Sequence, residues 1–513
     1  MRDQKGAAGP RTELRPVLLA LGAVLLYLAT APGTVNADGL GYLKLLSHDF
    51  AAGHLLYMPL LRFATTHLGG DGLKIGRLVD ALLGGTGVLL VYGIASRIAP
   101  LRADRRFVAT VAASGTALSY GWWIECDDVE AYALATVALL ALVRVALAYE
   151  RRPGLGRAAV IGVLLGACVC CHLTHVLLSF FVVVVCLGDP RGRKEGLLAA
   201  AVALLVGGAL ALGLYAYAAF VVRGHHVEGA VRWVLSAQHG YAEHSGLYAV
   251  ASAVYGLART FVWSPYLYEA DAPKLIGQLL LGLALLVFFG ATIHARRGAL
   301  AQLPWPPLLA LVVPYAILGM LFFGADPERW IFLLPFVWIV VAIALDASAL
   351  RHARAALVLA YVGGLNLALA VWPQHRDSWT RHKAELASQP MSTGDLVVFP
   401  GHSWDEYVAF YGSHDVEPFP LSYYAARDGE RALWARLDRE VGSARARGYA
   451  VYALRLFDEA SEVSDDPAGY AELRAIGMSR GALRAGLQAR FRIVTVLDRD
   501  GVTVVRLDPP SAP

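Results

Sequence analysis

Charged residues and cysteines are scarce in this chain. Charged side chains make up 17% of its 513 residues, and 45 Lys and Arg against 41 Asp and Glu leave a formal charge of +4. This surplus sits in short loops and is too small to indicate a nucleic-acid partner. Four of the five cysteines lie inside apolar runs, so they do not form the disulfide framework of a small secreted domain.

Internal repeats, coiled-coil heptads, low-complexity segments and a Gly-rich phosphate loop are also missing from the sequence. Repeat architectures and P-loop nucleotide binding are therefore not indicated. Apolar residues, in contrast, make up 57% of the chain, and its mean hydropathy is +0.50. A soluble fold could not bury this much apolar surface, which predicts a multi-pass α-helical membrane protein.

Nine segments are long and apolar enough to cross a bilayer, or nearly so. The first imitates a signal peptide, but Pro32 would follow the cleavage site, so we interpret it as a membrane helix. A further stretch, 158–187, would be roughly 45 Å long as one helix, against a hydrocarbon core of about 30 Å. Two short helices that meet at its histidines fit better. The nine segments are 16–32, 75–96, 107–124, 131–149, 196–222, 274–293, 305–323, 330–348 and 355–372.

Basic residues in short loops mark the cytoplasmic side of a membrane protein. If 158–187 crosses twice and 248–263 lies in the outer interface, every basic loop falls inside and the chain has eleven helices. The alternative makes 158–187 one helix and 248–263 a span, which leaves the basic loop 191–194 outside. Both predict a cytoplasmic N-terminus and an extracytoplasmic C-terminal region, in a bacterial inner or plasma membrane.

Beyond residue 372 the composition changes to a charged mixture in which strand and helix patterns alternate. This pattern predicts a small α/β domain. The chain would then divide into a basic cytoplasmic tail (1–15), a transmembrane domain (16–372) and a soluble extracytoplasmic domain (373–513). The expected strands are 395–399, 449–456, 491–497 and 502–507, and the expected helices are 404–411, 427–447 and 467–487.

Unusual charges collect in the predicted outer loops. Asp38 follows the first helix and is either a turn residue or a general base at the membrane surface. Four carboxylates lie between Glu125 and Glu130, where mutual repulsion should raise some of their pKa values unless a cation or a donor-rich ligand lies among them. A solvated acidic loop is the simpler interpretation.

Two histidines and two arginines stand out against apolar surroundings. His172 and His175 are one helical turn apart, and they could bond between helices, join neighbouring cysteines in a metal site, or donate to a phosphate. Arg329 begins a late helix on the outer side, where it could anchor the membrane surface or clamp a phosphate group. Arg259 is a similar but weaker candidate.

Four patches of the sequence stand in a characteristic order. They are Asp38 with His54-Leu-Leu-Tyr57, Glu130-Ala-Tyr132-Ala-Leu134, Gly166 to His172-Leu-Thr174, and Glu328-Arg329-Trp330. Taken together, these patches resemble the glycosyltransferase C (GT-C) superfamily, within it the protein O-mannosyltransferase-like branch of bacterial membrane proteins. The match covers roughly residues 15–375 in order and topology. The first outer loop lacks the family's proline pair and glycine, which leaves the acceptor preference open.

The resemblance implies an inverting transfer of a hexose, such as mannose, from a polyprenyl-phosphate donor to a hydroxyl of a protein, glycan or lipid. Asp38 would deprotonate that hydroxyl. Glu130 and Asp128 would orient sugar hydroxyls or hold Mg²⁺ or Mn²⁺. The other expected substrate-binding residues are His54 and Tyr57 in the outer loop, and His172, His175, Arg259 and Arg329 around the leaving phosphate.

Two other classes of protein could contain eleven membrane helices. A transporter or lipid flippase would explain histidines inside the membrane, but no inverted repeat is visible and the charges gather at one face. A sensor or assembly protein would explain an outer domain that binds a ligand. Consumption of a lipid-linked sugar distinguishes the enzyme from both.

Overall fold

A computed structural model of the protein describes residues 14–46, 50–236, 246–263, 290, 294, 297–322, 324–401, 403–457 and 478–510. Within these residues the chain forms two compact units. Of the described residues, the membrane unit contains those in 14–31, 42–263 and 290–373. The second unit contains those in Pro32–Gly41 and from Gln374 onward. The helix predicted at 274–293 lies outside the described residues, apart from position 290.

Apolar helices build the membrane unit, because a chain in a bilayer must satisfy its own main-chain polar groups. In the described part, four helical runs are long and apolar enough to cross a membrane. They are α4 (Gly72–Ile98), α7 (Ala131–Tyr149), a run that begins with α10 (Arg193–Ala216), and a run that begins with α17 (Arg351–Asn366). The shorter apolar helices are α1 (Leu14–Ala29), α8 (Leu155–Cys171), α9 (Leu178–Leu187), α15 (Trp305–Leu321) and α16 (Leu334–Asp346).

The structure thus confirms a helical architecture of membrane type, and the count of eleven crossings stays a prediction. The predicted segment 107–124 is divided at Ser119, whose hydroxyl accepts a hydrogen bond of 2.8 Å from Trp338 Nε1. Short connecting elements complete the unit. They are residues 42–45 of α2 (Ala37–Leu45), whose first half belongs to the second unit, and η1 (Ala52–His54), α3 (Tyr57–Leu68), α5 (Arg105–Leu118), α6 (Tyr120–Asp127), η2 (Leu173–Leu177), η3 (Tyr217–Val222), α11 (Val227–Ser236), α12 (Gly246–Phe261), α14 (Arg297–Leu300), η4 (Pro327–Trp330) and η5 (Leu367–Val371).

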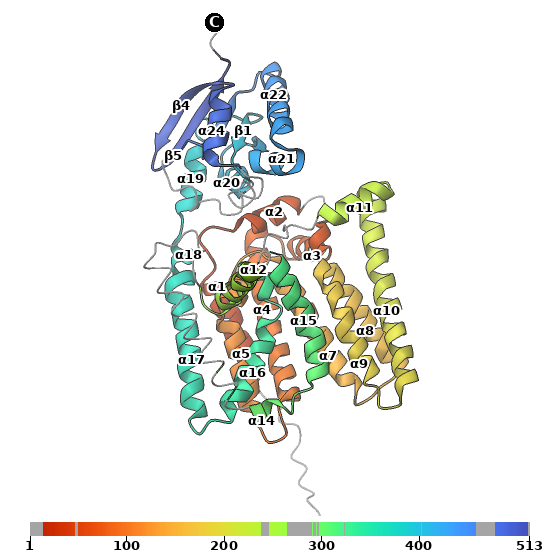
Figure 1. Ribbon diagram of the computed structural model, residues 1–513. Helices are drawn as coiled ribbons and strands as arrows, with labels where there is room; N and C mark the ends of the chain where they lie inside the picture. The colour runs from red at the N-terminus through yellow and green to blue at the C-terminus, as the bar shows by residue number, and fades with distance from the viewer. Residues whose placement is uncertain are drawn as a thin grey trace, which may run out of the picture. The chain divides into compact units, whose positions relative to one another are not determined.

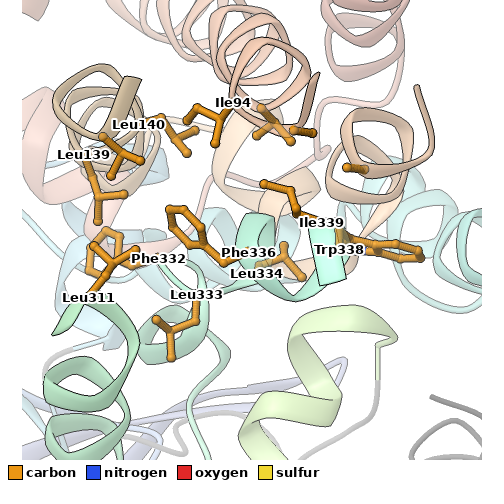
Figure 2. Close-up of a cluster of buried hydrophobic side chains, with 14 of the residues drawn as sticks. Ile94, Leu139, Leu140, Leu311, Phe332, Leu333, Leu334, Phe336, Trp338 and Ile339 are labelled. Carbon is orange, nitrogen blue, oxygen red and sulfur yellow. The ribbon is translucent and has the colours of Figure 1, made fainter. Parts of the chain in front are cut away.

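One continuous hydrophobic core joins most helices of the membrane unit. Helices α8, α9 and α10 lie together on one side of this unit, and α17 lies on the opposite side (Figure 1). Figure 2 shows part of the core, in which Phe332 belongs to the same buried cluster as Leu139, Leu140 and Leu311. The core therefore anchors the segment between η4 and α16, which carries Phe332.

The second unit is built on a five-stranded sheet of order β2-β1-β3-β5-β4. Strand β1 is parallel to β2 and β3, whereas β5 is antiparallel to β3 and β4. Asp500 (φ 51°) and Gly501 (φ 71°) form the turn of the β4–β5 hairpin, as an Asp-Gly pair favours. The strands are β1 (Leu396–Phe399), β2 (Glu417–Pro420), β3 (Val451–Leu454), β4 (Arg492–Arg499) and β5 (Val502–Asp508).

Helices cover both faces of this sheet because successive side chains of a strand point to opposite faces. Leu396 and Val398 pack with one group of helices, and Val397 and Phe399 pack with the other. The four predicted strands are observed, while β2 was not predicted; its two prolines restrict it to the edge of the sheet. The helices on the sheet are α19 (Trp379–Ser388), α20 (Ser403–Tyr411), α21 (Leu421–Asp428), α22 (Glu430–Ala446) and α24 (Arg480–Gln488). The short helix α18 (Trp372–Arg376) precedes them, and 467–477 of the last predicted helix lie outside the described residues.

The second unit also includes the segment that follows α1, which the sequence did not indicate. Gly33 N donates to Gln374 O at 2.9 Å, and Thr34 Oγ1 donates to Asp377 O at 3.0 Å. Val35 N donates to Tyr411 Oη at 3.1 Å. This segment is therefore bonded to the main chain and side chains of residues more than three hundred positions later.

Candidate functional site

The membrane unit contains a helix break at His172. Helix α8 ends at Cys171, and His172 has an extended backbone (φ −155°, ψ 124°) before the 3-10 turn η2 begins. The last carbonyls of a helix have no partner within the helix. Here Cys170 O accepts from Leu56 N at 3.0 Å, and Cys171 O accepts from His54 Nδ1 at 3.3 Å. These bonds hold His54 at the break, and its ring centroid lies 4.9 Å from that of His172.

Aromatic rings surround this pair of histidines. The ring of Tyr132, from the start of α7, lies 5.5 Å from that of His54 and 5.3 Å from that of His172. Phe332 lies 5.3 Å from His172 and 4.6 Å from His175. We call His54, Tyr132, His172, His175 and Phe332 the ring cluster. It unites parts of the chain that are far apart in sequence.

His175 is the enclosed member of the ring cluster. Its exposure is 0%, and its Nε2 lies 3.0 Å from Ala135 O. A carbonyl can only accept, so Nε2 carries the proton and the neutral ring accepts from Tyr315 Oη at Nδ1, 2.6 Å away. Both nitrogens of His175 are therefore engaged between α7 and α15.

Arg329 reaches the ring cluster through Tyr132. It lies in the 3-10 turn η4, whose first N–H groups are capped by Asp326, which accepts from Glu328 N at 3.1 Å. The Nη1 atom of Arg329 lies 3.5 Å from Tyr132 Oη, and its Nε lies 3.6 Å from Asp326 Oδ2. The guanidinium is thus oriented by a carboxylate on its own turn.

Arg259 supports the turn that carries Arg329. It is 3% exposed, and its Nη1 donates to Ala325 O at 3.2 Å. The next residue, Thr260, donates to Pro327 O at 3.2 Å. A Cβ at Gly256 would collide with Gly324 O, so a glycine is needed where α12 meets the turn.

Asp80, which the sequence analysis did not single out, connects two predicted site residues. It lies in α4 with 0% exposure, and its Oδ2 accepts from Tyr57 Oη at 2.6 Å and from Glu130 N at 3.0 Å. Tyr42 joins this group to the ring cluster, because its ring lies 5.1 Å from Tyr57 and 6.0 Å from His54. A carboxylate inside an apolar run is itself a signal of a functional site, and it could have identified Asp80.

The acidic segment is buried rather than solvated: Glu125, Asp127, Asp128 and Glu130 are all buried. Asp128 pairs with Arg77 at 3.3 Å. Burial and the neighbouring Asp128 raise the pKa of Asp127, and Arg77 partly opposes them. In the part of the chain that the structure describes, no three His, Cys, Asp or Glu side chains form a group that could hold a metal ion.

Asp38 lies in the first turn of α2 with an exposed side chain. The cap of this helix is Asn36, whose Oδ1 accepts from Gly39 N at 2.6 Å. Asp38 is therefore a helical residue rather than the turn residue that ends α1. It belongs to Pro32–Gly41, which is part of the second unit.

The structure thus brings most of the predicted site residues of the membrane unit into two connected groups. His54, His172 and His175 meet in the ring cluster, which Arg329 reaches through Tyr132, and Arg259 supports its turn. Tyr57 and Glu130 meet at Asp80, and Asp128 pairs with Arg77. The sequence analysis missed the roles of Asp80, Arg77 and Phe332.

Comparison with solved structures identifies the fold. ArnT from Cupriavidus metallidurans in the apo state matches with a TM-score of 0.53 and 13% identity, over 96% of this chain and 99% of that chain. The Archaeoglobus fulgidus oligosaccharyltransferase tethered with an acceptor peptide matches with a TM-score of 0.51 and 13% identity, over 98% and 75%. The archaeal oligosaccharyltransferase AglB from Archaeoglobus fulgidus, in complex with an inhibitory peptide and a dolichol-phosphate, matches with a TM-score of 0.50 and 12% identity, over 97% and 75%.

These structural neighbours are GT-C glycosyltransferases, and this chain shares their fold. The fold predicted from the sequence resemblance is confirmed. No protein-family model and no curated protein matches the sequence. At this level of identity the likeness concerns the fold, and the chemistry must be argued from the side chains.

Proposed function

We propose that this protein is a membrane glycosyltransferase that moves a sugar from a polyprenyl-phosphate-linked donor to a hydroxyl acceptor. The observation that carries this proposal is the meeting of His54, His172 and Arg329 around Tyr132 at a helix break of a GT-C fold. Phosphate departure from a sugar needs hydrogen-bond donors where negative charge develops. The archaeal enzyme of the same fold binds a dolichol-phosphate, which supports a lipid phosphate as the carrier.

The proposed transfer is a single inverting displacement. An acceptor hydroxyl attacks the anomeric carbon while Asp38 takes its proton, and the bond from that carbon to the phosphate oxygen breaks. The electron pair leaves with the lipid phosphate. Because attack and departure occur on opposite faces of the sugar, the anomeric configuration inverts.

The other site residues bind the two substrates in this proposal. Arg329 and His172 donate to the leaving phosphate, and His54 and Tyr132 enclose it. Glu130 accepts hydrogen bonds from sugar hydroxyls, at a position fixed by Asp80, which also holds Tyr57. His175 and Arg259 act mainly as supports because their own polar groups bond to neighbouring elements.

The proposed topology puts this chemistry on the extracytoplasmic side. The N-terminus is cytoplasmic, eleven helices cross a bacterial inner or plasma membrane, and the C-terminal domain faces outward. The donor arrives within the membrane as a lipid, and the acceptor is a protein, a glycan or a lipid. The archaeal oligosaccharyltransferase that was solved tethered with an acceptor peptide supports a protein as one such acceptor.

Donor consumption tests the function. Membrane vesicles that contain the protein are given polyprenyl-phosphate sugars with a labelled sugar, and intact donor is measured over time by thin-layer chromatography. We expect the wild type to consume at least one donor and Asp38→Asn to consume none, because the amide cannot accept the proton. Asp71→Asn is the matched control, since Asp71 caps α4 by accepting from Leu73 N and Asn caps equally well.

The outcomes separate the alternatives. Full activity of Asp38→Asn, with normal amounts of protein in the membrane, would reject Asp38 as the base. A wild type that moves the labelled lipid between leaflets but leaves it intact would instead be a flippase. Loss of activity in Asp71→Asn as well would show that the assay reports folding rather than catalysis.

A further inference from the structure

Thr174 follows the helix break and bonds to His172 in two ways. Its main-chain N–H donates to His172 Nδ1 at 3.3 Å, and its hydroxyl oxygen lies 2.6 Å from the same nitrogen. A main-chain N–H can only donate, so Nδ1 must offer its lone pair. The hydroxyl therefore donates to Nδ1 too, and the proton of the neutral ring lies on Nε2.

The Nε2–H group of His172 is directed away from these bonds. Among the described residues Nε2 has no hydrogen-bond partner, and His172 retains 7% exposure inside the ring cluster. His175 differs, because it is fully buried with both nitrogens bonded. Of these two rings, His172 is the one that offers an N–H group to a ligand.

We infer that Thr174 is a positioning residue that holds His172 as the Nε2–H tautomer, so that this ring donates to a phosphate oxygen of the lipid carrier without needing a positive charge. The inference rests on the proposed function for its ligand. The tautomer itself depends only on the contacts of His172 and can be measured separately. A neutral donor suits this place, since an added charge enclosed by aromatic rings would be costly.

The kinetic test removes the hydroxyl while keeping the shape of the side chain. Thr174→Val should lower the turnover rate about tenfold, because the hydrogen bond from His172 to the phosphate oxygen is weakened. The KM for the donor should stay within about twofold of the wild-type value. Thr174→Ser keeps the hydroxyl and should retain wild-type turnover. Thr116→Val is the matched control, because Thr116 is a buried threonine whose hydroxyl bonds to Ala112 O within α5.

A double-mutant cycle separates positioning from simple packing. His172→Gln replaces the ring with an amide that needs no tautomer, so adding Thr174→Val to it should cost no further activity. An equal tenfold loss in both backgrounds would overturn the inference. Equal losses in Thr174→Ser and Thr174→Val would overturn it as well, because the hydroxyl would then be irrelevant.

A spectroscopic test does not depend on activity. In protein labelled with ¹⁵N in the histidine rings, the His172 signals are those missing from His172→Gln. We expect a bare Nδ1 and a protonated Nε2 in the wild type, and a changed Nδ1 shift in Thr174→Val. A proton on Nδ1 in the wild type would reject the inference even if the protein transfers sugar, whereas inactive protein with the expected tautomer would reject the proposed function alone.

Discussion

Two sets of polar side chains, one from each unit of this protein, differ in how deeply they are buried. In the membrane unit, Asp80 and His175 are fully buried and bond to the main chain or to a phenol on another helix. In the second unit, Glu417 and Arg447 form an ion pair whose side chains are each 46% exposed. A buried polar group that loses its partner lowers the free energy of unfolding far more than an exposed one does. Buried polar groups are therefore the better places to look for function.

We expect the largest loss of activity from a substitution of Arg329, a partly buried cation of the membrane unit. Arg329→Gln removes a cation at the ring cluster, and we expect donor consumption to fall about 10²- to 10³-fold, as when a transition-state donor is lost. Arg329→Lys should recover only part of this loss, because an ammonium lacks the planar fork of a guanidinium. Initial rates in vesicles at equal protein content measure both variants.

The matched control for Arg329 is Arg232→Gln. Arg232 pairs with Glu228 on α11, and its side chain is largely exposed. We expect near wild-type activity from this control. If Arg329→Gln is equally active, the guanidinium does not contact the leaving group and the phosphate must be bound elsewhere.

Asp80 comes next. Asp80→Ala leaves two buried donors, Tyr57 Oη and Glu130 N, without their acceptor. Each unpaired donor should lower the free energy of unfolding by roughly 1–3 kcal/mol. We expect a clear drop of the melting temperature in detergent and weaker donor binding, since Glu130 loses its main-chain anchor. Asp80→Asn keeps one acceptor oxygen and should lose less.

Tyr57→Phe provides the check on this interpretation. If the Tyr57 hydroxyl stabilises the protein through Asp80, then Tyr57→Phe and Asp80→Ala should not add. Strict additivity of the two melting-temperature losses would show that the 2.6 Å contact contributes nothing by itself.

The sequence predicted most of the apolar helices in the described part of the chain, because each depends on local hydropathy. The segment 107–124 is divided at Ser119, and 274–293 lies outside the described residues apart from position 290. The break at His172 was also predicted, because a stretch of that length is too long for one crossing and contains two histidines. The connection of Asp80 to Glu130 could not be predicted in the same way. It depends on how α4 packs against the turn before α7, which one chain's periodicity does not reveal.

The candidate site shows the same limit. His54 and His172 were identified by residue type and by resemblance, yet their contact arises from one main-chain bond, from Leu56 N to Cys170 O, and from the bond of His54 Nδ1 to Cys171 O. Strand β2 was missed because a Glu-Pro-Phe-Pro sequence argues against a strand, although prolines are tolerated at a sheet edge. Both the contact of the two histidines and the formation of β2 depend on hydrogen bonds between segments that are distant in the sequence.

The smallest effect should come from the exposed pair of the second unit. A hydrogen bond and the charge of Arg447 lower the pKa of Glu417. Since the folded pKa is below the unfolded one, the stabilisation is present above the unfolded value and is lost as pH falls through the folded value. Calorimetry of the full chain in detergent should show a slight loss for Glu417→Gln at pH 7, and none in acid or at 1 M salt, where charges are screened. A loss as large as that of Asp80→Ala would mean that this exposed pair and the buried Asp80 stabilise the protein alike, and the contrast between the two sets of side chains would fail.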